Sequence, residues 1–249
     1  MAEAGAAASI DGTVADDVRR RMALVLDVDD LVEAIRLGQS LRPWFGVAKV
    51  GLELFSAAGP DAIGALRDMG YQVFLDLKLF DIPATVASAV RQLASRRVDF
   101  CTVHGNDGML RAAADAKGDM QILAVTALTS LDQGDLDDLG FQCDAKTLVL
   151  SRARRALAAG CDGVVSSGLE VSALRESVDH ALITVCPGIR PIFNDEATAA
   201  DDRQRVMTPG RAIADGADYL VVGRPIRDAA DPRAAAEAIQ AEIRKACIS

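Results

Sequence analysis

The stretch FLDLKLFDIP, residues 74–83, begins like a buried β-strand yet carries three charged side chains. Successive residues of a strand point to opposite faces, so Phe74, Asp76 and Lys78 should share one face. Asp81 falls in the loop that follows, just before a proline that can open a helix. Charges set into an apolar run in this way predict a functional site at the end of the strand.

Working outward from this stretch, short apolar runs alternate with amphipathic helical patterns along the whole chain. Strands are expected at residues 23–28, 45–51, 72–77, 100–103, 122–126, 163–166, 182–186 and 219–222. Helices are expected at residues 30–40, 60–69, 82–96, 109–116, 145–159, 171–178 and 231–245. Eight strands that alternate with helices predict an α/β protein with a (β/α)₈ TIM barrel.

An open, doubly wound sheet is the main alternative, and periodicity alone does not exclude it. No GxGxxG motif follows the first expected strand, where the sequence reads DVDD at residues 27–30, so a dinucleotide site is not expected. The pattern gives no internal domain boundary. We expect a flexible segment at residues 1–20 and a single barrel domain at residues 21–249.

Composition narrows the class of protein. Half of the 249 residues are hydrophobic and the formal net charge is −9, which disfavours nucleic acid and anionic membranes as partners. No apolar run reaches the length that spans a membrane. The five cysteines lack CxxC spacing, and the N-terminus lacks the basic start of a secretory signal. A cytoplasmic protein with reduced thiols is expected, rather than a disulfide framework or a zinc site.

Two more charges lie at expected strand ends. Asp27 closes the first strand and Lys49 interrupts the second, although the chain has few lysines. In a barrel these residues would point into the mouth, where barrel enzymes have their active sites. The alternative is a pair of buried salt bridges, but such pairs contribute little net stability.

Two glycine–arginine pairs suggest a phosphate site. Gly223 and Arg224 follow the eighth strand, and Arg190 follows Pro187 and a glycine after the seventh. In TIM barrels the loops after these two strands often bind phosphate, which arginine can grip with two hydrogen bonds. The long polar stretch at residues 193–205 is typical of an active-site lid or of a disordered segment.

Six motifs, in this order, resemble the orotidine 5′-phosphate decarboxylase family. They are LVLDVDD at 24–30, AKVGLELF at 48–55, FLDLKLFDIPATV at 74–86, VTALTS at 125–130, CPGIRP at 186–191 and VVGRPI at 221–226. The third motif is the most specific. The resemblance extends from residue 23 to the C-terminal helix.

The resemblance implies a homodimeric barrel that decarboxylates orotidine 5′-phosphate to UMP, the last step of UMP synthesis, without metal or cofactor. It implies that Lys78 donates a proton to C6 of the pyrimidine and that Asp76 lies beside the substrate carboxylate. It also implies that Asp81 reaches the site of the partner subunit.

The remaining site residues follow from the same resemblance. It implies that Asp27 and Lys49 hold the ribose hydroxyls and the charged array, and that Thr85 reaches the ribose across the dimer. It implies that Thr129 contacts the pyrimidine. The residues implied around the phosphate are Pro187, Arg190, Gly223 and Arg224. One departure concerns Arg203, which stands where many relatives have a glutamine that holds the phosphate. Either Arg203 or, after a shift of one residue, Gln204 could take that role.

Two rival functions share part of this pattern. Magnesium-dependent sugar-phosphate decarboxylases and hexulose-phosphate synthases also use D-x-K-x-x-D, but they place an acidic metal ligand where Lys49 stands. A catalytically dead barrel that binds nucleotide or a protein partner is the other alternative, and the presence of Lys78, Asp76 and Asp81 opposes it. Of the two histidines, His104 is expected to be structural and His180 to lie on the surface.

Overall fold

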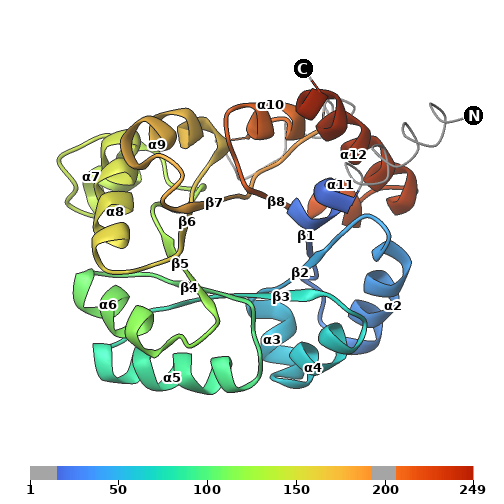
Figure 1. The fold of residues 1–249 in the computed structure, drawn as a ribbon, viewed down its shortest axis with the longest axis horizontal. Coiled ribbons are helices and arrows are strands. Elements are labelled where there is room, and N and C mark those ends of the chain that lie inside the picture. The colour runs from blue at the N-terminus through green and yellow to red at the C-terminus, as the bar shows by residue number, and fades with distance from the viewer. Residues whose placement is uncertain (1–15, 192–205, 249) are drawn as a thin grey trace, which may run out of the picture.

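The computed structural model describes residues 16–191 and 206–248. Eight parallel strands close into a barrel in chain order, and Figure 1 shows the helices outside this ring. The strands are β1 (Met22–Val25), β2 (Val47–Val50), β3 (Gln72–Leu79), β4 (Phe100–Val103), β5 (Gln121–Val125), β6 (Gly163–Val165), β7 (Ile183–Cys186) and β8 (Tyr219–Val222). The predicted TIM barrel is therefore confirmed, and the open sheet is excluded.

The helices cover the outer face of the barrel. They are α2 (Leu31–Leu41), α3 (Leu52–Ala58), α4 (Asp61–Asp68), α5 (Pro83–Ser95), α6 (Asp107–Ala116), α7 (Gln133–Asp138), α8 (Ala145–Ala158), α9 (Val171–Val178), α10 (Pro209–Ala214), α11 (Arg224–Arg227) and α12 (Pro232–Ile248). The short helices α3, α7 and α11 were not expected from the sequence. Within the described residues, none of these helices is long and apolar enough to cross a membrane.

The predicted alternation along β3 is confirmed. Leu75 is buried in the large core between the strands and the helices, and Leu77 packs against that core. Phe74 belongs instead to the smaller cluster inside the barrel. Its ring meets Phe100 edge-on at 6.2 Å, and Phe100 meets Tyr219 at 5.2 Å, so a row of aromatic rings packs inside the barrel.

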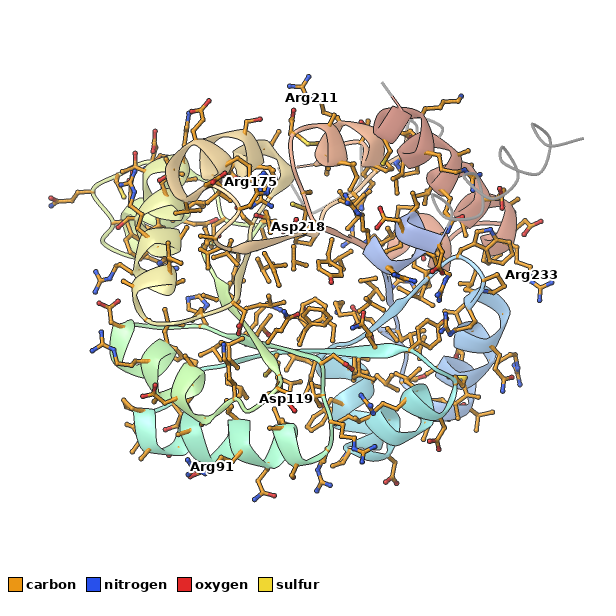
Figure 2. The ribbon with its side chains drawn as sticks, viewed as in Figure 1. Arg91, Asp119, Arg175, Arg211, Asp218 and Arg233 are labelled. Atoms are coloured by element: carbon orange, nitrogen blue, oxygen red, sulfur yellow. The ribbon has the colours of Figure 1, made fainter. Side chains whose placement is uncertain are left out.

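At the amino ends of the strands, an aspartate precedes each of β4, β6 and β8. Asp99, Asp162 and Asp218 accept hydrogen bonds from the backbone N–H groups that open the preceding strands, at 2.7–2.8 Å. Each also pairs with a cation; Arg175 on α9 lies 2.5 Å from Asp218, and both are labelled in Figure 2. These partly exposed pairs tie neighbouring strands together, and none of them lines the cavity described below.

Two sequence predictions concern segments at or beyond the edge of the described residues. Of the expected flexible segment 1–20, residues 1–15 lie outside them, whereas residues 16–20 are helical and Val18 is fully buried. The packed chain therefore begins before residue 21. The expected lid at 193–205 also lies outside the described residues.

Candidate active site

A cavity of about 410 Å³ opens at the carboxyl ends of the barrel strands. This is the end where TIM barrels carry their active sites. The cavity brings together predicted site residues from six strand ends. They are Asp27, Lys49, Asp76, Lys78, Thr129, Pro187, Arg190, Gly223 and Arg224.

Four charged side chains form an alternating row in this cavity. The Nζ atom of Lys49 lies 3.3 Å from Oδ1 of Asp27 and 3.6 Å from Oδ2 of Asp76. The other oxygen of Asp76, Oδ1, lies 2.9 Å from Nζ of Lys78. Lys49 is almost fully buried, while a third of the Lys78 side chain is exposed to the cavity. The row therefore ends in an ammonium group that a ligand can reach.

Asp76 is the electrostatic centre of the row. Burial alone would raise the pKa of its carboxyl, but Lys49, Lys78 and the hydrogen bond from Thr102 together hold that pKa below its ordinary value. Asp76 is therefore a carboxylate at neutral pH. It carries a fixed negative charge between two ammonium groups.

The backbone of β3 departs from regular strand geometry where it carries these charges. Lys78 has a φ of 49°, in the left-handed region that residues with a side chain seldom adopt. The pairing of β3 with β4 shifts between Leu75 and Leu79. Irregularities of this kind re-aim side chains next to active sites.

Gly51, in the motif AKVGLELF, leaves room for the first ion pair. A Cβ atom at this position would lie 2.3 Å from Oδ1 of Asp27 and 2.9 Å from Nζ of Lys49. Because its φ is −93°, the glycine is required for space and not for backbone freedom. The sequence analysis did not single out this residue.

The cavity also has a basic wall. Arg190 follows β7, and Gly223 and Arg224 follow β8, where Arg224 opens the short helix α11. The cavity is also lined by Arg227, which the sequence analysis did not predict. This wall of arginines suits an anionic group of the ligand, because a guanidinium can bind such a group with two hydrogen bonds.

Two predicted residues lie elsewhere. Asp81 and Thr85 are exposed and do not line this cavity, although Asp81 accepts a hydrogen bond from the Ile82 N–H. They are flanked by exposed apolar side chains, with Phe80 68% and Ile82 64% accessible. Arg203, like Gln204, lies outside the described residues.

The surface position predicted for His180 is confirmed, whereas the structural role of His104 stays a prediction. His104 is half-buried and meets the ring of Phe80 edge-on at 5.7 Å, and burial lowers the pKa of its imidazole. His180 is exposed. Neither of them lines the charged cavity.

Sequence reasoning missed several cavity residues. Glu53, from the first turn of α3, brings a further carboxylate, and Ser130 adds a hydroxyl beside Thr129. Glu53 stands four residues after Lys49, but in the sequence it looks like a solvent-facing helix residue. No group of three or more His, Cys, Asp and Glu side chains with metal-binding geometry occurs in residues 16–191 and 206–248.

Comparison with known proteins gives consistent relatives. A sequence model of the orotidine 5′-phosphate decarboxylase / HUMPS family matches residues 20–239. Orotidine 5′-phosphate decarboxylase of Methylococcus capsulatus is 58% identical over 228 residues, covering 91% of this chain and 93% of the relative. That of Xanthomonas campestris pv. campestris is 47% identical over 235 residues, covering 92% and 93%. The crystal structure of the Lactobacillus acidophilus orotidine 5′-phosphate decarboxylase superposes with a TM-score of 0.75 at 37% identity, covering 90% of this chain and 99% of that one.

Proposed function

Because this chain belongs to the orotidine 5′-phosphate decarboxylase / HUMPS family, we propose that Lys78 supplies the proton that replaces the carboxylate of orotidine 5′-phosphate. The chain is a decarboxylase that converts orotidine 5′-phosphate to UMP in pyrimidine biosynthesis. The observation that carries the proposed role is the Lys78 ammonium, which lines the cavity 2.9 Å from the Asp76 carboxylate.

The reaction breaks the bond between C6 of the pyrimidine and the carboxylate carbon. Carbon dioxide leaves, and the electron pair of that bond stays on C6. A proton moves from Nζ of Lys78 to C6 and forms the new C–H bond, and the neutral amine then regains a proton from water. Since no carbonyl group next to C6 can accept the negative charge, a fixed ammonium is the group that stabilises it.

Asp76 has two proposed effects. It fixes the direction of the Lys78 ammonium, and it repels the substrate carboxylate that is about to leave. At 4 Å that repulsion amounts to about 1 kcal/mol in water and about 4 kcal/mol at an effective dielectric constant of 20. Binding of the remote phosphate can offset it, so that the repulsion is released as carbon dioxide leaves.

Asp27 and Lys49 continue the charged row and are proposed to hold the ribose hydroxyls. Lys49 contacts two carboxylates at 3.3 Å and 3.6 Å. These contacts favour a metal-free decarboxylase site over the metal site of the magnesium-dependent sugar-phosphate enzymes. A lysine ammonium stands between the two carboxylates that would otherwise attract a divalent cation. We therefore propose a reaction that needs no metal or cofactor.

The rest of the substrate is assigned to the other walls of the cavity. We propose that Thr129 contacts the pyrimidine, and that the phosphate is bound by Pro187, Arg190, Gly223 and Arg224. The arginines that line this wall supply the charge, and Gly223 allows close approach of the backbone. Arg203, outside the described residues, is proposed to take part as well.

We also propose that the protein is a homodimer in which Asp81 and Thr85 complete the site of the partner subunit. Both residues are exposed on this chain, at the start of α5 and beside the accessible side chains of Phe80 and Ile82. Exposed apolar side chains around polar site residues are typical of a protein interface. The five free cysteines, three of them buried, suit the reducing cytoplasm as the compartment.

The direct test follows the fall in ultraviolet absorbance of orotidine 5′-phosphate with EDTA present. Wild type should turn over, and Lys78→Ala should lose about a thousandfold or more in kcat. Lys117→Ala is the matched control, because Lys117 also pairs with an aspartate but lies away from the cavity. Turnover that EDTA abolishes and magnesium restores would contradict the metal-free proposal, and full activity of Lys78→Ala would contradict the proton donor.

A further inference from the structure

Thr102 on β4 lies beside the charged end of β3, and its side chain is fully buried. Its Oγ1 atom accepts a hydrogen bond from the backbone N–H of Lys78 at 2.8 Å and lies 3.0 Å from Oδ1 of Asp76. A hydroxyl has one proton, and the Lys78 N–H can only donate. The Thr102 proton must therefore point at Asp76, so the hydroxyl accepts from one residue of the pair and donates to the other.

The Thr102 hydroxyl takes the place of a missing backbone partner. Leu75 pairs with Cys101 and Leu79 with Val103, so β3 advances by four residues while β4 advances by two. Lys78 lies in this irregular interval, in its left-handed conformation. Its backbone N–H has left the regular ladder, and a side-chain oxygen of the neighbouring strand receives it.

Thr102 therefore holds the catalytic ion pair from both of its ends. Oδ1 of Asp76 receives the Thr102 hydroxyl and also the Lys78 ammonium at 2.9 Å. The same hydroxyl fixes the backbone from which the Lys78 side chain starts. Thr102 does not itself line the cavity and so does not touch the substrate.

We infer that Thr102 is a positioning residue for decarboxylation, which sets the direction of the Lys78 ammonium through its backbone and through Asp76. This inference rests on the proposed function of those two residues. The alternative is a purely structural role, in which the hydroxyl satisfies one buried N–H and changes only stability.

Thr102→Val tests the inference, because valine keeps the shape and removes both hydrogen bonds. We expect kcat to fall about tenfold to a hundredfold, the usual effect of a small displacement of a reacting group, with KM little changed. The acid limb of the kcat–pH profile should move to higher pH, because the lost hydrogen bond had lowered the pKa of Asp76. Thr102→Ser should restore both properties.

The matched control is Thr126→Val. Thr126 is also a fully buried threonine, but its hydroxyl donates to the Val165 carbonyl and touches no charged group. It should lose stability and keep kcat and its pH profile. If Thr102→Val does not fold, Thr102→Cys replaces it, because a thiol is a much weaker donor and acceptor.

The outcomes separate this inference from the proposed function. A folded Thr102→Val or Thr102→Cys enzyme with wild-type kcat and pH profile, beside an inactive Lys78→Ala, would overturn only the role of Thr102. An active Lys78→Ala enzyme would overturn the proposed function itself. Equal losses in Thr102→Val and Thr126→Val would show a general effect of buried threonines and would also overturn the inference.

Discussion

Lys49 on β2 reaches across to Asp76 on β3, with its Nζ atom 3.6 Å from Oδ2. The strand register pairs Lys49 with Phe74, so Asp76 stands two residues further along on the same inward face. Oδ1 of Asp76 binds Lys78 and Oδ2 faces Lys49, which makes one carboxylate the counter-ion of two lysines. The ionisation of Asp76 therefore controls the whole row.

Asp76→Asn should be less stable than wild type by about 2 to 4 kcal/mol at pH 7, because it leaves Lys78 without its partner. The folded pKa of Asp76 lies below its unfolded value, so its stabilising contribution is present above about pH 4 and is lost as pH falls through the folded pKa. Urea unfolding from pH 8 to pH 3 should give a difference that is constant down to about pH 4 and begins to narrow below it. Asp119→Asn, at an exposed turn position labelled in Figure 2, is the control with little difference at any pH. A difference that grows between pH 4 and pH 3 would contradict the assignment.

Gly51→Ala should break the pair between Asp27 and Lys49, since the new methyl group would lie 2.3 Å from Oδ1 of Asp27. A displacement of this size near the reacting groups should lower kcat/KM by about tenfold to a hundredfold. Gly64→Ala is the control, because nothing lies within 4 Å of its Cβ position and alanine favours helix α4 by about 0.5–1 kcal/mol. Steady-state kinetics and thermal unfolding measure the two effects. Unchanged kinetics in Gly51→Ala would mean that the pair can shift without loss.

Arg224→Ala should weaken the enzyme selectively toward phosphorylated substrate. A charged hydrogen bond contributes about 1.5–3 kcal/mol, so kcat/KM for orotidine 5′-phosphate should fall roughly tenfold to a hundredfold. With orotidine, which lacks the phosphate, wild type and variant should be alike. Arg91→Ala, on the exposed face of α5, should match wild type with both compounds. An equal loss on both compounds would place Arg224 away from the phosphate.

Mixing Lys78→Ala with Asp81→Ala subunits should recover activity if the sites are shared across a homodimer. After random exchange half of the dimers are mixed and each has one complete site, so about a quarter of wild-type activity is expected. The control mixture, Lys78→Ala with Asp76→Ala, should recover nothing, because those residues belong to the same site. Absence of recovery in the first mixture, with subunit exchange verified by tagged chains, would refute the shared site.

Asp218→Asn should separate stability from catalysis. Asp218 accepts the Thr184 N–H and pairs with Arg175 at the end of the barrel away from the cavity. Its neutralisation should lower the free energy of unfolding by about 1–3 kcal/mol and leave kcat unchanged. Asp215→Asn should cost less, because Asp215 pairs with the exposed side chain of Arg211. A changed kcat in folded Asp218→Asn would show that the two ends of the barrel are coupled.

Sequence reasoning located the barrel and the charged row for clear physical reasons. Buried parallel strands are apolar throughout, so aspartate and lysine inside such runs stand out. Strand alternation then correctly placed Phe74, Asp76 and Lys78 on the inward face. The arginines that follow glycines after the last two strands also stood out, and they line the same cavity.

Other features depend on contacts between distant segments. The left-handed backbone of Lys78 donates its N–H to Thr102, which lies 24 residues later. No sequence pattern at either residue predicts this contact. Helix α3 begins at Gly51 without a side-chain cap, so its start gives no recognisable pattern. Glu53 on that helix looks like an ordinary surface residue, although the fold turns it into the cavity.

The left-handed backbone at Lys78 has a consequence for protein engineering. A side chain in this region costs about 1 kcal/mol relative to glycine. Lys78→Gly relieves this strain but also takes one lysine partner from the Asp76 carboxylate, and the loss of that partner costs more than the strain relieved. Selection for heat resistance alone would therefore keep a cation at position 78. Growth without added uracil, which requires UMP synthesis, would in addition select for the proposed proton donor.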